Sequence, residues 1–321
     1  AVVGATGYAG AELVRILSGH PEVDLTVITS RQYAGTPYDT IYPSLNGFVT
    51  LRCAGNDPAA IAGHADVVFL ALPHKASMDM APELIDAGKR VVDLSADFRF
   101  RNRVAYEAHY QPHRCAHLLE KAVYGLCEIH GDDVAAADLI GNPGCYPTSV
   151  LLPLLPLIGE GLVDPTAIIA DCKSGVSGAG RGATATTHFC HVNESFKAYN
   201  VGGHRHTPEI EEQLSLRAGV TVNITFVPHL IPMTRGMQST IYATPSSMSD
   251  PARIGQCLAS FYANKPFVRL RPDGRVPDTL HVKGTNFCDI GWQVDPGSGR
   301  IILLSAIDNL VKGAAGQAVQ N

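Results

Sequence analysis

The chain has 321 residues, a formal net charge of −5 and a sequence pI of about 6.2, and hydrophobic residues make up 45% of it. This acidic balance argues against a nucleic-acid-binding protein, which needs a basic face, and no stretch reaches the ~18 uninterrupted apolar residues of a membrane helix. Its eight cysteines include no C-x-x-C pair, which is typical of reduced thiols and favours a cytoplasmic protein.

Over residues 1–143, short apolar strands alternate with helix-like segments. Two helices are predicted, one over Tyr8–Ser18 before a Gly-His-Pro stop and one over 78–87 before Gly88. The strands have the near-continuous apolar character of a parallel sheet buried on both faces, and they are predicted at Ala1–Val3, Leu25–Thr29, Val67–Leu72, Val91–Leu94 and Leu139–Gly141. This alternation predicts a doubly wound α/β domain.

After residue 144 the strands become longer and alternate more clearly, and few helices intervene, among them Pro251–Ala263. The strands are predicted at Ile168–Lys173, Val222–Val227, Gln238–Thr244, Phe287–Val294 and Ile301–Ala306. This pattern is typical of an α+β domain with a mainly antiparallel sheet. We therefore expect a Rossmann-type parallel-sheet domain of residues 1–143 and 307–321, the latter a helical return. Residues 144–306 would then form a catalytic and oligomerisation domain.

The chain opens on an apolar strand that runs into a glycine turn and then a helix. Gly4, Gly7 and Gly10 form the pattern G-x-x-G-x-x-G. Glycines allow a tight turn and let the amides at a helix N-terminus approach a pyrophosphate. Because such a turn can also be purely structural, this pattern alone is a weak sign of dinucleotide binding. The chain starts inside this strand without Met and ends inside a predicted helix, so we expect further residues at both ends.

The end of the second predicted strand bears on cofactor choice. Thr29, Ser30 and Arg31 stand about 20 residues after the turn, where NAD-specific folds usually carry an acid for the ribose hydroxyl. A hydroxyl followed by arginine suits a 2′-phosphate instead, which favours NADP over NAD. The alternative is a solvated arginine on a loop.

Two later strand ends are candidates for the same site, because ligands bind at the carboxyl ends of parallel strands. The first is Leu72-Pro73-His74, and the second runs from Leu94 through Ser95 to Arg99. His74 could equally be an ordinary loop histidine, and Asp97 with Arg99 an ordinary ion pair.

Cys145 lies in the run G-N-P-G-C-Y-P-T, where Pro147 suits the first turn of an apolar helix. This predicts that Cys145 lies just before a helix N-terminus, where the helix dipole lowers a thiol pKa and free amides can stabilise an oxyanion. The alternative is a small buried hydrophobe. That alternative is favoured for the other cysteines in apolar runs, which are Cys53, Cys172, Cys257 and Cys288.

A thiol nucleophile usually works with a nearby base. The run G-G-H-R-H-T-P-E, with His204, Arg205 and His206, is the best supplier of a base and of an anion-binding arginine. A zinc site involving these histidines and His188, Cys190 and His191 is disfavoured, because the spacings fit no standard zinc pattern. The loop 174–181, S-G-V-S-G-A-G-R, could close over a nicotinamide or a phosphate, or be a generic glycine loop.

Taken together, the motifs resemble the N-acetyl-γ-glutamyl-phosphate reductases of arginine biosynthesis over nearly the whole chain. They are, in order, G-A-T-G-Y-A-G, A-L-P-H, D-L-S-A-D-F-R, G-N-P-G-C-Y-P-T, S-G-V-S-G-A-G-R, H-R-H-T-P-E, F-V-P-H-L and K-G-A-A-G-Q-A-V-Q-N. The cysteine and H-R-H motifs are specific, whereas the glycine turn is shared with aspartate-semialdehyde dehydrogenases. Ser149 stands where we expect Gly or Ala, a small departure.

The resemblance implies NADPH-dependent reductive dephosphorylation of N-acetyl-L-glutamyl 5-phosphate, with Cys145 as nucleophile and His204, five residues before Glu209, as acid/base. It implies NADP(H) contacts at Gly4, Thr6, Gly7, Tyr8, Ala9, Gly10, Ser30, Arg31, Leu72, Pro73, His74, Ser95, Ser177, Gly178 and Asn309. Substrate contacts are expected at Asn142, Ser174, Arg181, Arg205 and Glu209. No metal is expected, and the partners would be the small-molecule substrate, inorganic phosphate and further copies in a homodimer or homotetramer.

Three alternatives stay open. The chain could be an aspartate-semialdehyde dehydrogenase or a reductase of a carrier-linked aminoadipyl phosphate, although the aromatic-proline pair after Cys145 and the H-R-H run favour the acetylglutamyl enzyme. It could also be a non-catalytic NADP-binding sensor, which an intact Cys145 beside an intact H-R-H run disfavours.

Overall fold

A computed structural model of the protein describes residues 1–246, 251–271 and 274–321. The chain divides into two compact units, residues 1–143 with 314–321 and residues 144–313. The sequence placed the return to the first unit at 307. In the structure the chain rejoins it at 314, because Asp308 and Asn309 are hydrogen-bonded to Gly284 and Gly236 of the second unit.

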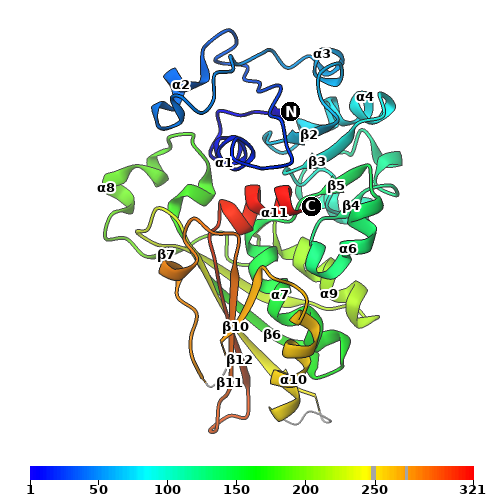
Figure 1. Ribbon diagram of the computed structural model, residues 1–321. Helices are drawn as coiled ribbons and strands as arrows, with labels where there is room; N and C mark the ends of the chain where they lie inside the picture. Colours follow the sequence, from blue (N-terminus) through cyan, green and yellow to red (C-terminus); the bar gives the residue numbers. More distant parts are fainter. Residues whose placement is uncertain (247–250, 272–273) are drawn as a thin grey trace. The chain divides into compact units, whose positions relative to one another are not determined.

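The first unit contains a five-stranded sheet in the order β1-β2-β3-β5-β4, and all its paired strands are parallel. Its strands are β1 (Val2–Val3), β2 (Val67–Leu70), β3 (Arg90–Asp93), β4 (Val123–Tyr124) and β5 (Leu139–Gly141) (Figure 1). The predicted strand Leu25–Thr29 is wrong as a regular strand. Although Val2 exchanges hydrogen bonds with Val27 and Thr29, only isolated bridges form there. The short β4 was not foreseen.

Both faces of this sheet are covered, as its apolar strands require. The helices of the unit are α1 (Tyr8–Leu17), α2 (Tyr38–Ile41), α3 (Pro58–Ala62), α4 (Ala81–Asp86), α5 (Arg103–His109), α6 (Cys127–Ala136) and α11 (Gly316–Gln320). Val2 shares one core with Leu13 of α1 and Ala318 of α11, whereas its neighbour Val3 shares the other with Leu84 of α4. Successive strand residues thus point into different cores, which is the alternation that a β-strand imposes.

The second unit contains a seven-stranded mixed sheet in the order β10-β11-β12-β9-β6-β8-β7 (Figure 1). Four of its strand pairs are antiparallel, and the pairs β6–β8 and β10–β11 are parallel, which confirms the mainly antiparallel prediction. The strands are β6 (Val163–Ser174), β7 (Lys197–Ala198), β8 (Ile224–Leu230), β9 (Met237–Pro245), β10 (Val268–Arg271), β11 (Cys288–Val294) and β12 (Ile301–Ile307).

A buried helix, α7 (Cys145–Gly159), packs on β6, β9 and β12. All its residues from Tyr146 to Ile158 are buried, which matches its almost uniformly apolar sequence. Helix α9 (Thr207–Ala218) packs against α7, as does α10 (Pro251–Tyr262), and the short α8 (Phe189–Val192) follows the glycine loop. Among the described residues, no helix is both long and apolar enough to cross a membrane.

Candidate active site

The glycine turn between β1 and α1 is tight enough to exclude side chains. Gly4 has a φ of +78°, and a Cβ placed on it would lie 2.4 Å from the carbonyl oxygen of Ala71. A Cβ on Gly10 would lie 2.2 Å from the carbonyl oxygen of Gly4. Since neither contact is possible for real atoms, the turn requires glycine at both positions and presents backbone rather than side chains.

The N-terminus of α1 suits an anionic ligand. Its N-cap, Gly7, offers no side-chain hydrogen bond to the first turn, and that turn contains no acidic residue. The amides of Tyr8 and Ala9 therefore begin a helix whose positive end carries no side-chain cap. Together with the glycine cradle, this arrangement fits the pyrophosphate of a dinucleotide.

The predicted cofactor residues of the second strand join this turn. The Oγ1 of Thr6 lies 3.0 Å from the Oγ of Ser30, and the amide of Gly4 donates to Thr29 Oγ1 at 3.4 Å. Arg31 is exposed beside them. The segment 29–31, which the sequence predicts to bind a 2′-phosphate, is thus hydrogen-bonded to the glycine turn.

Sequence reasoning missed two tyrosines that hold the turn. Tyr38 donates its hydroxyl to the carbonyl oxygen of Ala5 at 2.8 Å, and Tyr42 donates to that of Thr6 at 2.9 Å. Their i, i+4 spacing could have signalled a shared face, because residues four apart on a helix are neighbours.

At the ends of β2 and β3, the polar side chains have hydrogen-bond partners within the same two segments. His74 Nδ1 accepts from the amide of Ala96 at 2.9 Å, and Ser95 donates to Asp93 at 2.7 Å. Burial, with the nearby Asp97 carboxylate, raises the pKa of Asp93 to about 6. Of the other predicted contacts here, Leu72 is half-buried and Pro73 is exposed.

Two predicted polar residues have structural partners inside the first unit. Arg99 donates to the carbonyl oxygens of Asn142 at 2.6 Å and Leu94 at 2.7 Å. The Asn142 amide donates to the carbonyl oxygen of Ala314 at 3.2 Å and accepts from Asn321 at 3.0 Å. Asn142 thereby ties the end of β5 to the C-terminal helix, and its substrate contact stays a prediction.

Cys145 is the first residue of α7, within the first turn rather than just before it as the sequence suggested. The N-cap is Gly144, whose amide donates to Glu209 Oε1 at 2.9 Å. Glu209, which is 1% exposed, thus anchors the start of α7 from the first turn of α9. Cys145 is half-buried and so remains accessible at a helix N-terminus. In contrast, Cys172 is fully buried, and burial raises its thiol pKa to about 12.

Cys145 opens into a cavity of about 640 Å³ formed within the second unit. The predicted residues Ser174, Gly178, His204 and Arg205 line it. His206 of the predicted H-R-H run and Tyr146, which follows Cys145, line it as well, together with Lys197 and Tyr199, which sequence reasoning left aside. Every described residue that lines this cavity is neutral or basic, so it favours an anionic ligand.

His204 lies among aromatic rings. Its ring centroid is 5.6 Å from Tyr146, 5.5 Å from Tyr199 and 5.3 Å from Phe226. Burial, with a smaller contribution from Arg205, lowers its pKa to about 4. Its Nδ1 accepts from the amide of His206 at 3.1 Å, so the neutral ring carries its proton on Nε2. His204 is therefore a neutral hydrogen-bond donor near pH 7.

The ring of His206 is a neighbour of the His204 ring, with centroids 5.0 Å apart, and lies against the backbone that precedes Cys145. A Cβ placed on Gly144 would be 2.5 Å from His206 Nε2. Glycine at position 144 is what lets the imidazole approach the first turn of α7 so closely.

The glycine-rich loop of residues 174–181 is hydrogen-bonded to Asn309, near the end of the second unit. Asn309 donates to Ser177 Oγ at 2.9 Å and accepts from the amide of Gly236 at 2.8 Å. Ser174 donates its hydroxyl to the carbonyl oxygen of Gly175, and Arg181 is exposed and does not line the cavity. Among the described residues, no group of three or more His, Cys, Asp or Glu is placed to hold a metal ion.

Two sequence families match the chain, one for each unit. Residues 1–137 match the semialdehyde dehydrogenase NAD-binding domain, and residues 145–309 match the semialdehyde dehydrogenase dimerisation domain. A protein of Desulforapulum autotrophicum called N-acetyl-gamma-glutamyl-phosphate reductase is 58% identical over 321 residues, which are all of this chain and 93% of that protein. A protein of Geobacter metallireducens with the same description is 56% identical, with the same coverage.

The chain belongs to the N-acetyl-gamma-glutamyl-phosphate reductase family. It is therefore an oxidoreductase with a nicotinamide-dinucleotide-binding domain. The fold is shared beyond this family. The aspartate semialdehyde dehydrogenase II structure from Vibrio cholerae matches with a TM-score of 0.75 at 17% identity, over 99% of this chain and 95% of that one. The NADP complex of the Candida albicans aspartate semialdehyde dehydrogenase matches over the same shares, with a TM-score of 0.69 at 17% identity.

Proposed function

We propose that this oxidoreductase catalyses the NADPH-dependent reductive dephosphorylation of N-acetyl-L-glutamyl 5-phosphate to N-acetyl-L-glutamate 5-semialdehyde, in arginine biosynthesis. The observation that carries the proposal is the cavity of the second unit, which Cys145 at the first turn of α7 lines together with two histidines and two cations. The full-length relatives named for this reaction support the choice of substrate.

The glycine turn would hold the cofactor pyrophosphate on the amides of α1, since close packing at Gly4 and Gly10 makes the turn tight and no side chain caps the helix. Ser30 and Arg31 would receive the 2′-phosphate, which is why NADPH is proposed over NADH. When bound, the nicotinamide supplies the hydride that reduces the acyl group.

Lys197 and Arg205 are the cations of the cavity and would bind the substrate's anionic groups. Lys197 was not foreseen as a site residue. Arg181 remains a predicted contact, but its place outside the cavity lining makes Lys197 the stronger candidate. Ser174 lines the same cavity and would bound the substrate.

Cys145 would act as the nucleophile. A histidine takes the thiol proton, the thiolate forms a C–S bond to the acyl carbon, and the C–O bond to phosphate breaks as phosphate leaves with that proton. The N-terminus of α7 stabilises negative charge on the acyl oxygen. After reduction of the thioester, the C–S bond breaks, the aldehyde leaves, and the thiolate recovers a proton from solvent through the same histidine.

The geometry favours His206 over His204 as the group that takes the thiol proton. His206 Nε2 lies against Gly144, next to the nucleophile, whereas His204 uses Nδ1 as an acceptor and has a pKa of about 4. His204, with its proton on Nε2, suits donation to a developing oxyanion. The resemblance-based assignment of the acid/base to His204 stays a prediction, and the two assignments differ in a measurable way.

The reaction is tested most directly in reverse. The purified protein would be incubated with NADP, inorganic phosphate and either N-acetylglutamate 5-semialdehyde or aspartate 4-semialdehyde, and NADPH formation followed. We expect phosphate-dependent reduction of NADP with the acetylated aldehyde and a far slower rate with aspartate semialdehyde. The reverse preference would identify an aspartate-semialdehyde dehydrogenase, and no turnover with either would favour a cofactor-binding sensor.

A second copy of this chain is the proposed partner, as a homodimer or a dimer of dimers, and the dimerisation family that matches the second unit supports this. The face of its sheet opposite α7 is a candidate surface, because alternate residues along β9 and β12 there are only half-buried. Light scattering of the purified protein tests this assembly.

Cytoplasmic location is proposed because a reactive Cys145 requires a reducing compartment.

A further inference from the structure

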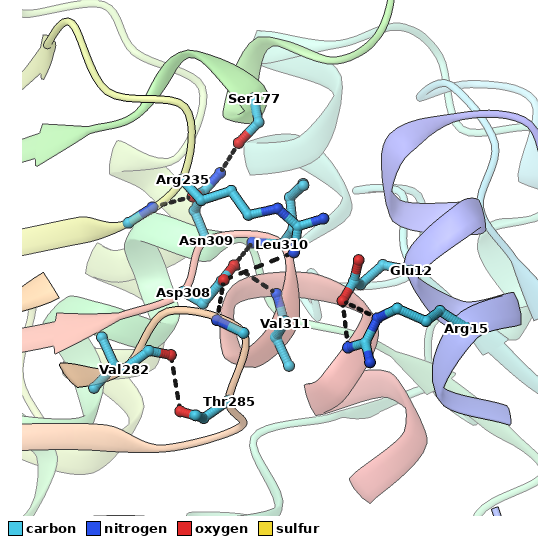
Figure 2. A network of polar contacts seen from close by, with 12 residues as sticks. Glu12, Arg15, Ser177, Arg235, Val282, Thr285, Asp308, Asn309, Leu310 and Val311 are labelled. Atoms are coloured by element: carbon cyan, nitrogen blue, oxygen red, sulfur yellow. Dashed lines mark hydrogen bonds and ion pairs between the residues drawn. The ribbon is translucent and has the colours of Figure 1, made fainter. Parts of the chain in front are cut away.

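A buried carboxylate follows β12 directly. Asp308 is 0% exposed. Its Oδ1 accepts from the amides of Leu310 at 2.8 Å and Val311 at 3.2 Å, and its Oδ2 accepts from Gly284 at 2.7 Å (Figure 2). Arg235 Nη1 lies 3.8 Å from the same oxygen. Asp308 thus fixes the backbone of two segments by hydrogen bonds, the one that follows it through Oδ1 and the one at Gly284 through Oδ2.

The segment that Asp308 caps is a π-helical turn, Val311–Ala315. The amide of Gly313 donates to the carbonyl oxygen of Asp308 at 3.0 Å, a span of five residues. Such turns are rare, and they occur frequently at functional sites. In this chain the widened turn brings Gly313 toward the nucleophile.

Gly313 lies directly against Cys145. A Cβ placed on Gly313 would be 2.8 Å from Cys145 Cβ, 3.2 Å from its Cα and 3.3 Å from Ile307 Cδ1. With His206 against Gly144 on the preceding residue, the backbone around the nucleophile is closely approached at two glycines. The position of Cys145 Cβ is therefore set by packing as well as by α7.

The same segment also holds the glycine loop. Asn309 bonds to Ser177 and to the amide of Gly236 (Figure 2). Ser174 and Gly178, which flank Ser177 in the chain, line the cavity with Cys145. Residues 308–313 therefore contact both Cys145, through Gly313, and the loop that carries Ser174 and Gly178, through Asn309.

We propose that Asp308 and Gly313 are positioning residues for Cys145. The carboxylate holds the π turn closed, and the glycine of that turn forms the wall that keeps the cysteine side chain in its reactive orientation. This inference rests on the proposed role of Cys145 as nucleophile, and it assigns neither residue a contact with the substrate.

The test compares Gly313→Ala, Asp308→Ala and Asp308→Asn with wild type. A matched control is Gly131→Ala in α6, where an added Cβ meets nothing within 4 Å. For each protein, the iodoacetamide alkylation rate of Cys145 is measured across pH by peptide mass spectrometry, together with kcat, KM, NADPH binding and Tm. The alkylation plateau at high pH decides the matter, because the thiol is fully ionised there. A plateau that changes while the pKa from the same pH profile stays at the wild-type value reports orientation and access, since thiolate nucleophilicity otherwise varies with pKa.

We expect Gly313→Ala to lower kcat about a hundredfold, the order expected from displacing a reacting group by 1 Å. Its alkylation plateau should change, while NADPH binding and KM stay close to wild type. Asp308→Ala should resemble it, and Asp308→Asn should recover part of the loss because the amide oxygen can still accept from Leu310 and Val311. Gly131→Ala should leave all these values unchanged.

A folded Gly313→Ala protein with the wild-type plateau and kcat would overturn the proposal, as would loss of NADPH binding with an unchanged plateau. If Gly313→Ala does not fold, Asp308→Asn decides by the same readouts, since a purely structural cap would lower Tm without moving the plateau or kcat. Turnover in Cys145→Ser would instead refute the nucleophile, whereas the plateau would still report whether the π turn orients the thiol.

Discussion

Both the glycine turn and the surroundings of Cys145 depend on glycines at positions where a Cβ would clash, but the clashes arise in different ways. In the turn, Gly4, Gly7 and Gly10 come from one continuous stretch, and a Cβ on Gly10 is excluded by Gly4 itself, although a Cβ on Gly4 is also excluded by the more distant Ala71. Around Cys145, Gly144 and Gly313 are far apart in the chain, and each is needed because a distant segment packs against it. The comparison teaches that a glycine pattern can be read locally, whereas an isolated glycine acquires meaning only from its neighbours in space.

The largest expected effect is a loss of turnover that leaves cofactor binding unchanged, because the cavity around Cys145 and the glycine turn would carry these two properties separately. Cys145→Ser should lose turnover by several orders of magnitude, as expected on removing a covalent nucleophile, while NADPH binding stays unchanged because the glycine turn is intact. Steady-state assays and NADPH fluorescence titration measure the two properties. Cys190→Ser, at an exposed thiol, is the control and should behave like wild type. Substantial activity in Cys145→Ser would rule out the thioester.

The second prediction concerns the two histidines of the cavity. His206→Asn should lower kcat by about 10²–10⁴, the usual contribution of a positioned acid/base, and should slow alkylation of Cys145 near neutral pH. His204→Asn should keep alkylation near the wild-type rate, because His204 is a buried neutral donor. The opposite ranking in two folded variants, checked by circular dichroism, would return the acid/base role to His204.

A smaller effect is expected at the cofactor end. Arg31→Ala should raise the KM for NADPH about tenfold, at the lower end for a lost charge-assisted hydrogen bond because Arg31 is exposed, and leave the KM for NADH unchanged. Steady-state kinetics with both cofactors give the answer. Equal changes with both would show that Arg31 is a solvated loop residue. Arg52→Ala serves as the control, because Arg52 is also exposed and donates to the carbonyl oxygen of Gly35.

The smallest effect should appear in stability rather than activity. The pKa of Asp93 is raised from 3.8 to about 6, so the folded protein binds this proton more tightly than the unfolded chain. Its contribution to the free energy of unfolding should therefore increase as pH falls from about 7 to 4, by at most about 3 kcal/mol. Urea unfolding of wild type and Asp93→Asn at several pH values measures the difference. A wild-type curve parallel to that of Asp93→Asn would contradict it.

Structural elements that depend on residues close together in the sequence could be predicted. The α1 helix follows from Leu13, Val14 and Leu17 on one face, and the parallel sheet follows from its short apolar strands. The 25–29 strand was overestimated because its apolar residues pair only at isolated bridges. Lys197 was missed because a lysine on a two-residue strand carries no local signal that it lines a cavity.

By itself the sequence determined the two-part α/β and α+β architecture, the glycine turn and the identity of Cys145 as the candidate nucleophile. These depend on periodicity and short-range sterics, which act between residues close in the chain. Only the tertiary structure decided which histidine lies against Gly144, that Glu209 anchors the start of α7, and that the π turn after Asp308 packs on Cys145. Such contacts join segments tens to more than a hundred residues apart, and close packing rather than local propensity selects them.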